Sequence, residues 1–230
     1  EAREYMAQLG FRTFNEMIGR VDVLETDTAI KHWKASGIDL RAILHPAQKS
    51  HPKVGVYCER GQVHGLESAL DNTHLIGLAA PALQRAEPVR IDLPITNINR
   101  TVGTLLSHEI VKRWGESGLP EDTIRVQFSG SAGQSFGAWL AGGVTLQLEG
   151  DANDYVAKGL SGASISIKLS EESNLISSEN TIIGNTVLYG ATSGKLFAAG
   201  QAGDRFAVRN SGAISVIEGC DSKDRKSACR

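Results

Sequence analysis

Residues 130–150 read GSAGQSFGAWLAGGVTLQLEG, and this glycine-punctuated stretch decides the fold. Most of the chain's 25 glycines lie from residue 130 onward. Related stretches follow: KGLSGASISIKLS at 158–170, YGATSGKLFAAG at 189–200 and RNSGAISVIEG at 209–219. This part of the chain therefore has the pattern of an internal repeat.

The repeats align on one glycine each, which precedes a short run of β-forming residues alternating with smaller or polar ones. These anchor glycines are Gly142, Gly162, Gly194 and Gly212, separated by 20, 32 and 18 residues. A self-similar period near twenty predicts a solenoid, whose repeats must stack to bury an apolar face.

The two-residue alternation makes the repeated element a strand. We expect glycine at the corners because a sharply turning coil needs positive φ, which glycine adopts without a Cβ clash. In the longest gap, residues 186–189 are interpreted as a further strand-like run. The aligned apolar positions are Val144, Leu146, Leu148, Ile165, Ile167, Leu169, Leu196, Phe197, Ile214 and Val216.

Composition limits the function classes. The chain has 230 residues and is 41% apolar, enough for a core, and its formal net charge of -2 gives no electrostatic argument for nucleic acid or an anionic membrane. The longest aliphatic stretch, residues 75–80, is too short to span a bilayer. Three cysteines, Cys58, Cys220 and Cys229, lack metal or redox spacing, so we expect a reducing cytoplasm.

The N-terminal part has helical patterning of a different kind. Residues 1–24 place apolar side chains on helical stripes that are broken near Gly10. We expect these helices to form the outer part of a larger structure. Because the chain opens without an initiator methionine or a secretory segment, we expect a fragment of a longer polypeptide. Residues 25–60 have little periodicity and predict an irregular connector.

Helical spacing returns from Gly65 to Arg85, where we expect Pro81 to kink or end the helix. Residues 89–93 predict a strand, and residues 99–101 are candidates to start a helix from Val102 to Trp114. After a turn at 119–122, we expect Ile124, Val126 and Phe128 to begin the first coil.

One motif suggests catalysis. Residues 133–137, GQSFG, match the nucleophile elbow of serine hydrolases around Ser135 and follow a predicted strand. That class requires its histidine downstream of the serine, so we interpret Gly133 and Gly137 as corner glycines. All histidines of the chain lie upstream: His32, His45, His51, His64, His74 and His108.

Other ligand sites are weakly supported. No phosphate-binding glycine motif occurs, and Leu196 follows Gly194-Lys195 where a magnesium-binding hydroxyl is needed. Residues 151–154, DAND, open like a calcium loop but lack its later glycine and glutamate, so a solvated turn is favoured. A metal site from His45, His51, Cys58 and His64 matches no ligand spacing. We therefore predict no catalytic, cofactor-binding or metal-binding residue in this chain.

Several segments together resemble one known family, the C-terminal domain region of the glutamate synthase large subunit. The resemblance covers nearly the whole chain up to Gly219, including residues 1–24, which resemble the last helix of that enzyme's flavin-binding barrel. The segments that carry it are NINRTVGTLLSHE at 97–109, GSAGQSFGAW at 130–139, GDANDYV at 150–156, KGLSG at 158–162, IGNTVLYGATSG at 183–194 and RFAVRNSGA at 205–213.

This resemblance implies a mainly β protein, a right-handed single-stranded β-helix preceded by an α-helical and irregular segment. The implied domains are the end of the FMN-binding synthase barrel at 1–24, a connector with a helix at 25–88, a GXGXG β-helix at 89–219 and an atypical tail at 220–230. Ala157 and Ala163 stand where the family favours glycine.

The resemblance also implies a function for the parent enzyme, which makes glutamate from glutamine and 2-oxoglutarate with FMN and an iron–sulfur cluster. The cofactor and nucleophile residues belong to upstream sequence, so this segment is expected to be a noncatalytic scaffold packing against the synthase barrel and the amidotransferase domain. The alternative is a stand-alone β-helix subunit that docks on a separate flavoprotein, because the coil also resembles a formylmethanofuran dehydrogenase subunit.

The last coil carries a further expectation. Around Ile214, Val216 and Ile217 a solenoid that stops would leave a strand edge and an apolar face open. We therefore expect self-association at this end, or coverage by the tail at 220–230 or by the N-terminal helices.

Overall fold

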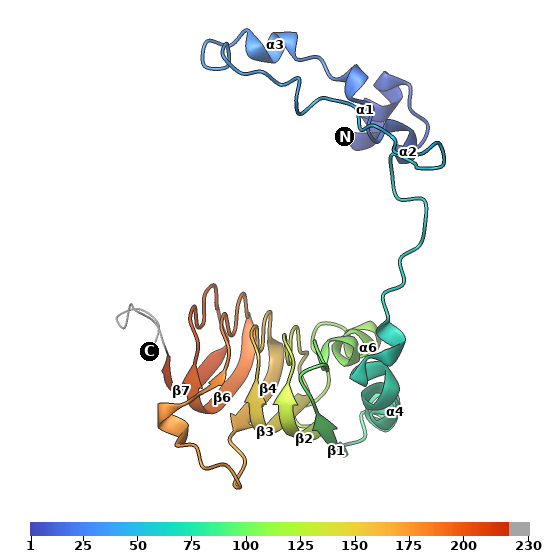
Figure 1. Cartoon of the computed structure of the whole chain (residues 1–230). Coiled ribbons are helices and arrows are strands. Elements are labelled where there is room, and N and C mark those ends of the chain that lie inside the picture. The colour runs from blue at the N-terminus through green and yellow to red at the C-terminus, as the bar shows by residue number, and fades with distance from the viewer. Residues whose placement is uncertain (221–230) are drawn as a thin grey trace. The chain divides into compact units, whose positions relative to one another are not determined.

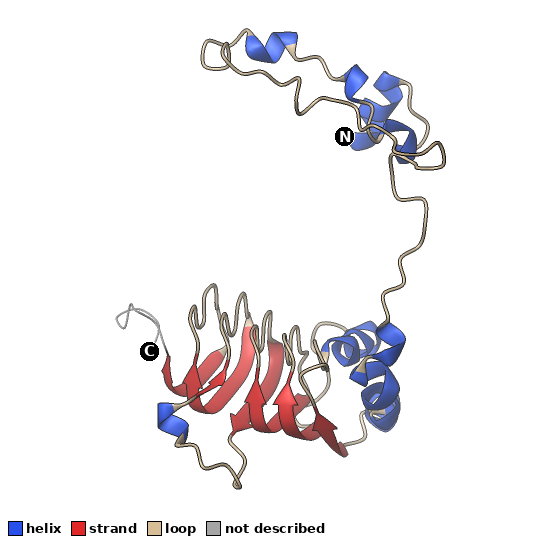
Figure 2. Cartoon of the chain, in the orientation of Figure 1, coloured by secondary structure: helices blue, strands red, loops and turns tan. Residues whose placement is uncertain are grey.

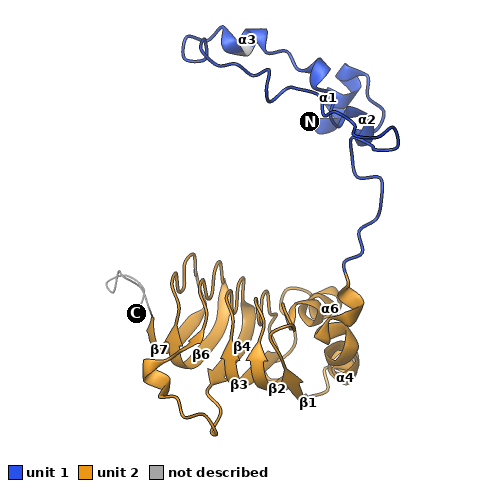
Figure 3. Cartoon of the chain, viewed as in Figure 1, with its two compact units in different colours: residues 1–64 blue, residues 65–230 orange. Residues whose placement is uncertain are grey.

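The computed structural model describes residues 1–220, and at Ala29 it describes the backbone alone. The chain forms two compact units, residues 1–64 and 65–230 (Figure 3). All strands of the described residues lie in the second unit, whose sheet is flanked by helices (Figure 2). The repeat-bearing part is therefore mainly β, as the sequence predicted.

The first unit contains short helices and long irregular stretches. Gly10 ends α1 in the left-handed conformation with φ 78°, so the predicted helix break is confirmed. No described side chain of residues 1–64 is buried, and this unit therefore has no apolar core of its own. Its helices are α1 (Ala2–Leu9), α2 (Phe14–Met17), η1 (Val21–Val23) and α3 (Asp27–Ile30).

Residues 65–85 are helical but interrupted. Pro81 lies in the first turn of α5, where a missing N–H costs nothing. The helical run is interrupted at Ala79, just before Pro81, so the expected break near the proline is confirmed, and Pro81 itself lies at the start of the next helix. The elements are η2 (Leu66–Ser68), the π-helical η3 (Asp71–Leu75), α4 (Ile76–Leu78) and α5 (Ala80–Arg85).

The strands form one seven-stranded sheet in which every pairing between strands is parallel. Neighbours along the sheet follow chain order from β1 to β4, then β6 and β7, and the glycine repeats thus lie side by side (Figure 1). The strands are β1 (Val89–Ile95), β2 (Ile124–Ala132), β3 (Val144–Ala152), β4 (Ser161–Lys168), β5 (Thr181–Ile183), β6 (Ser193–Ala202) and β7 (Ile214–Cys220).

An insertion explains the longest spacing between anchor glycines. Residues 169–180 leave the sheet after β4, include η4 (Ser177–Glu179), and return at β5. Both β4 and β5 pair with β3 and with β6. They therefore occupy the same position in the sheet, between β3 and β6, and β5 continues it after the insertion. The 32-residue gap is thus one ordinary coil carrying an inserted loop.

A second layer is made by the segments that follow the strands. We call residues 96–103, 133–140, 153–160, 184–191 and 203–210 the return segments. They stack on one another through backbone hydrogen bonds: Ser135 N donates to Asp154 O at 2.8 Å, and Ala157 N donates to Phe136 O at 2.9 Å. Each coil is therefore hydrogen-bonded to its neighbours on two sides.

Positive φ recurs at every second residue of the later return segments. Glycine is absent from many of these positions; Ala157, for example, has φ 55°. The expectation that glycine supplies the turning positions was therefore only partly right, because the interlocked ladder holds other residues in the left-handed region. The positions are Ser135, Gly137, Trp139, Tyr155, Ala157, Gly159, Thr186, Leu188, Gly190, Arg205, Ala207 and Arg209.

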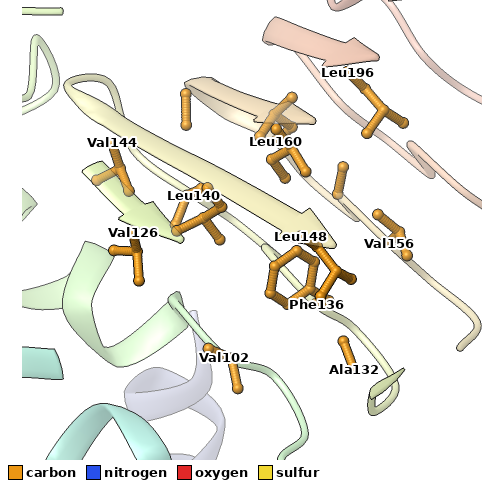
Figure 4. Packing of buried hydrophobic residues seen from close by; sticks show 14 of the residues in the cluster. Val102, Val126, Ala132, Phe136, Leu140, Val144, Leu148, Val156, Leu160 and Leu196 are labelled. Atoms are coloured by element: carbon orange, nitrogen blue, oxygen red, sulfur yellow. The ribbon is translucent and has the colours of Figure 1, made fainter. Parts of the chain in front are cut away.

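The apolar core lies between the two layers. Inward strand residues such as Val126 and Leu148 meet Phe136 and Leu160 of the return segments (Figure 4). Phe128 and Phe136 pack edge to face with ring centroids 5.6 Å apart. Because strands and return segments alternate along the chain, each coil contributes to both sides of the core.

Two interpretations of the repeat were wrong. Residues 186–189 form a return segment, not a strand, because Thr186 and Leu188 have positive φ. Ile214 and Val216 face outward, opposite Lys195 and Phe197 in the ladder. Alternation alone does not determine which face is buried. In β7 the inward positions are Ser215 and Ile217, which pair with the buried Leu196 and Ala198.

The β1 end of the sheet carries most helices of the second unit, whereas η4 lies against β6 and β7. Helix α6 (Thr104–Trp114) follows the β1 return segment and packs with η3, α4 and α5 (Figure 1). The Trp114 Nε1–H donates to Leu83 O at 2.9 Å. Residues 89–93 and 124–128 lie in β1 and β2, so both strand predictions are confirmed.

Helix α6 is capped from a distance. Its N-cap is Gly103, which offers no side chain, and not residues 99–101 as expected. The Asp71 carboxylate accepts hydrogen bonds from Gly103 N at 2.8 Å and Leu106 N at 3.0 Å. Burial raises the pKa of the Asp71 carboxyl, while these backbone N–H groups oppose the shift.

Gly150 tests the close approach of neighbouring coils. A Cβ on Gly150, at φ 146°, would lie 1.9 Å from Gly130 O. We expect Gly150→Ala to lower the free energy of unfolding by about 3 kcal/mol or more, measured by urea denaturation. Gly219→Ala is the control, because its Cβ would meet only the Gln201 side chain at 3.3 Å. Equal effects of the two substitutions would contradict the argument.

Ala207 tests the strain in the return segments. Its φ is 56°, so Ala207→Gly should raise the free energy of unfolding by about 0.5–1 kcal/mol. Ala213 is also half-buried but has no positive φ, and Ala213→Gly should lower stability by a similar amount. Calorimetric melting of both variants checks the sign, and two losses of stability would disprove the strain.

Asp71 tests the cap. We expect Asp71→Ala to lower the free energy of unfolding by about 2–3 kcal/mol, because it leaves buried N–H groups of α6 unsatisfied. Asp92→Ala, at an exposed position of β1, should stay within about 0.5 kcal/mol of the parent chain. Chemical denaturation followed by circular dichroism measures both. A stability of Asp71→Ala equal to that of Asp92→Ala would show that the cap contributes nothing.

Candidate interaction surface

Ser135, the residue of the nucleophile-like motif, lies in a return segment. Its φ is 62°, and its backbone N–H donates to Asp154 O in the next coil. None of the hydrogen bonds among the described residues joins its hydroxyl to a histidine. Gly133 lies against the preceding coil, where a Cβ would meet Asn97 O at 2.5 Å.

The calcium-like residues form part of a corner ladder. Asp154 Oδ1 accepts from Asn185 N at 2.8 Å, and Asn185 Oδ1 accepts from Asp204 N at 2.8 Å. Asp151 accepts from the Ser131 hydroxyl at 2.6 Å. These polar side chains therefore link one coil to the next. The interpretation of residues 151–154 as a solvated turn did not include this role.

The histidine and cysteine candidates all belong to the first unit. His51 Nδ1 accepts from Lys53 N at 3.1 Å, and Cys58 Sγ donates to Arg60 O at 3.1 Å. His45 lines a hollow of about 400 Å³ beside the Arg41–Asp39 ion pair. Within residues 1–220 no group of three or more histidine, cysteine or acidic side chains is placed to hold a metal ion.

The anchor glycines line one polar groove of about 540 Å³ along the starts of the strands. Lys195 beside Gly194 forms an ion pair with Glu121, Nζ to Oε1 2.8 Å, across this groove. That ion pair holds the pKa of the Lys195 ammonium above its ordinary value. Lys195 is therefore already engaged with an acidic partner. The groove also contains Ser161, Ser193, Gly142, Gly162 and Gly212.

The return layer carries a small aromatic cluster on its surface. Lys158 Nζ lies 4.9 Å from the Trp139 ring centroid and 5.5 Å from that of Tyr155. A Cβ on Gly159 would lie 2.5 Å from the Trp139 ring, so the indole covers the glycine closely. The rings bind the chain's own lysine, a cation–π contact within the fold.

The outward face of the sheet changes character along the stack. Outward positions of β2, β3 and β4 are mostly polar, and they include Gln127, Gln147 and Ser166 in one register row. The same row continues to Phe197 and Val216 in β6 and β7. A groove of about 410 Å³ lies over this row.

We call Phe197, Ile214, Val216 and Glu218 the β6–β7 patch. Its apolar members are 43%, 61% and 59% exposed, respectively. The sequence predicted an open apolar face around Ile214, Val216 and Ile217, but it aligned Ile214 and Val216 with buried positions of earlier repeats and so did not place them on the outward face of the sheet. The signal that can separate them is register: Ser215 and Ile217 match the buried Leu196 and Ala198.

The charges that surround the groove have partners except at the patch. In the described part of the chain the Glu218 carboxylate has no ion pair or hydrogen bond, although its β7 neighbours are apolar. The outward charges of β2, β3, β4 and β6 have partners: Arg125 contacts Asp122, Lys195 contacts Glu121, Lys168 contacts Glu171 and Glu149 accepts from Ser170. The patch therefore combines exposed apolar side chains with an uncompensated carboxylate.

The class of the protein follows from the stacked, glycine-cornered parallel coils and from a family comparison. A family model described as the GXGXG motif matches residues 71–225, more than half of the chain. The chain belongs to this GXGXG motif family.

The relatives that it matches are named as glutamate synthases. The chain is 50% identical over 220 residues to the "Glutamate synthase [NADPH] large chain" of Bacillus subtilis, covering 95% of this chain and 14% of the relative. It is 53% identical over 219 residues to "Glutamate synthase [NADH]" of Schizosaccharomyces pombe, covering 95% and 10%. The resemblance to the C-terminal region of the glutamate synthase large subunit is therefore confirmed.

The chain covers a small part of each relative's length. The chain spans only 10% and 14% of their lengths, so most of each relative lies outside the matched segment. A relative from Oryza sativa, 38% identical over 221 residues, is named "Ferredoxin-dependent glutamate synthase, chloroplastic". No helix among residues 1–220 has both the length and the apolar content needed to cross a membrane.

Proposed function

We propose that this chain is the structural C-terminal region of a glutamate synthase large subunit. The parent enzyme makes glutamate from glutamine and 2-oxoglutarate by reductive transamidation, in the cytoplasm, with FMN and an iron–sulfur cluster held by its other regions. The chain itself is a noncatalytic scaffold. The observation that carries the proposal is the identity of about half of the residues to large chains so named.

The fold assigned to this scaffold is a right-handed single-stranded β-helix. Support comes from the parallel register of successive coils and from the second hydrogen-bonded layer of return segments. In such a solenoid each repeat contacts only its neighbours, and the outer faces remain available for other domains.

The domain assignment extends the same proposal. Residues 1–24 end the FMN-binding synthase barrel, 25–88 connect it, and 89–219 form the GXGXG β-helix; the tail from residue 221 lies outside the described residues. Unit 1 supports a place within a larger body because it exposes large apolar side chains without burying any. Trp33 and Ile43 are each 76% exposed and Val63 is 93% exposed.

The partners of this scaffold are the synthase barrel and the amidotransferase domain of the same polypeptide. Relatives are named for NADPH, NADH and ferredoxin, so the scaffold sequence is compatible with different reductants. This tolerance fits a segment that does not touch the electron donor.

A chimeric enzyme tests the proposal. The chain replaces the matching segment of the Bacillus subtilis relative, and the control is the same large chain without that segment. We expect the chimera to form glutamate from glutamine and 2-oxoglutarate, and the control to be inactive. We expect the isolated chain to have neither this activity nor a flavin absorbance.

Opposite results have clear meanings. A folded but inactive chimera, or glutamate formation by the isolated chain, would reject the scaffold assignment. Full restoration by the chain added as a separate polypeptide would favour the stand-alone subunit instead.

A further inference from the structure

The apolar content of the sheet's outward face is confined to its last two strands. The polar positions Gln127, Gln147 and Ser166 occupy the same row on β2, β3 and β4. Only at β6 and β7 do large apolar side chains replace them. A change from polar to apolar along one register row marks a local interaction surface, since a sheet face that remains in water is normally polar.

The groove gives this surface a shape. The groove has a volume of about 410 Å³ and lies over Phe197 and Val216. Lys168 and Glu218 are among its lining residues. Lys168 is engaged by Glu171 at 3.5 Å, which leaves Glu218 as the uncompensated charge of the lining. An occupant that fills the groove must bring apolar side chains for its floor and a cation for Glu218.

A second copy of the chain is a poor occupant. Its own patch offers the same apolar groups together with another unpaired Glu218 and no free cation. Pairing two patches would bury apolar area but leave both carboxylates uncompensated or in mutual repulsion. Charge complementarity therefore favours a different, basic surface.

We propose that the β6–β7 patch is the docking face for a basic amphipathic segment belonging to the rest of the glutamate synthase large chain. Apolar side chains of that segment occupy the groove over Phe197 and Val216, and a lysine or arginine pairs with Glu218. This assignment rests on the proposed function and names the face through which the scaffold contacts its parent.

Hydroxyl-radical footprinting with mass spectrometry tests the docking directly. We expect oxidation of Phe197 and Val216 to be several-fold lower in the chimera than in the isolated chain. Equal oxidation of the patch in an active chimera would overturn the docking assignment while leaving the proposed function intact. A folded but inactive chimera would reject the proposed function itself.

Substitutions supply an independent readout. Val216→Ser and Glu218→Lys should lower the melting temperature of the chimera without changing that of the isolated chain, and Glu218→Gln should have a smaller effect. Ser129→Ala, an exposed substitution on β2, is the matched control. If the patch variants changed the melting temperature of the chimera no more than Ser129→Ala does, the assignment would be overturned. It would also be overturned if they lowered the melting temperature of the isolated chain by the same amount.

Light scattering of the isolated chain tests whether a second copy of the chain occupies the patch. We expect a monomer at concentrations where the chimera's patch is protected. A dimer that Val216→Ser or Glu218→Lys dissociates would identify a second copy as the occupant and overturn the proposal.

Discussion

The structure of unit 2 depends on the hydrogen-bonding distance between successive coils. Each coil must approach its neighbours closely on two sides, through parallel strands and through the return segments. Gly130 and Gly150 show how tight this approach is, since a single Cβ at Gly150 would overlap the carbonyl of the coil before it. The left-handed residues of the return layer follow from the same constraint, because the ladder fixes their backbone whatever side chain they carry.

This arrangement separates the buried core from the exposed faces. The inward faces make a continuous core from both layers, and the outward faces are left to vary from coil to coil. Helix α6 and the helices of residues 66–85 lie at the β1 end, where Asp71 accepts hydrogen bonds from Gly103 of the β1 return segment and from Leu106 of α6. The β6–β7 end instead presents exposed apolar groups and an unpaired Glu218, so the two ends of the stack differ in how they meet their surroundings.

Much of the fold was predictable from particular residues. The anchor glycines gave the coil length, and Ile124, Val126 and Phe128 marked the strand that opens the glycine-repeat region. Where prediction went wrong, the missing information was non-local: the 169–180 insertion lengthened one gap, and Ile214 and Val216 were assigned to the buried line. The Asp71 cap was not predicted, and the apolar face expected at the last coil was not predicted to include Phe197, because each feature depends on residues from different parts of the chain coming together.

The sequence by itself determined the repeat, the strand character of its repeated element and the family, because glycine spacing, alternation and motif identity are properties of local sequence. Only the tertiary structure decided which face of β7 is exposed, which residues hold positive φ and whether Glu218 has a partner among the described residues. These features depend on the register between coils, and register is set by packing and hydrogen bonding between segments far apart in the chain.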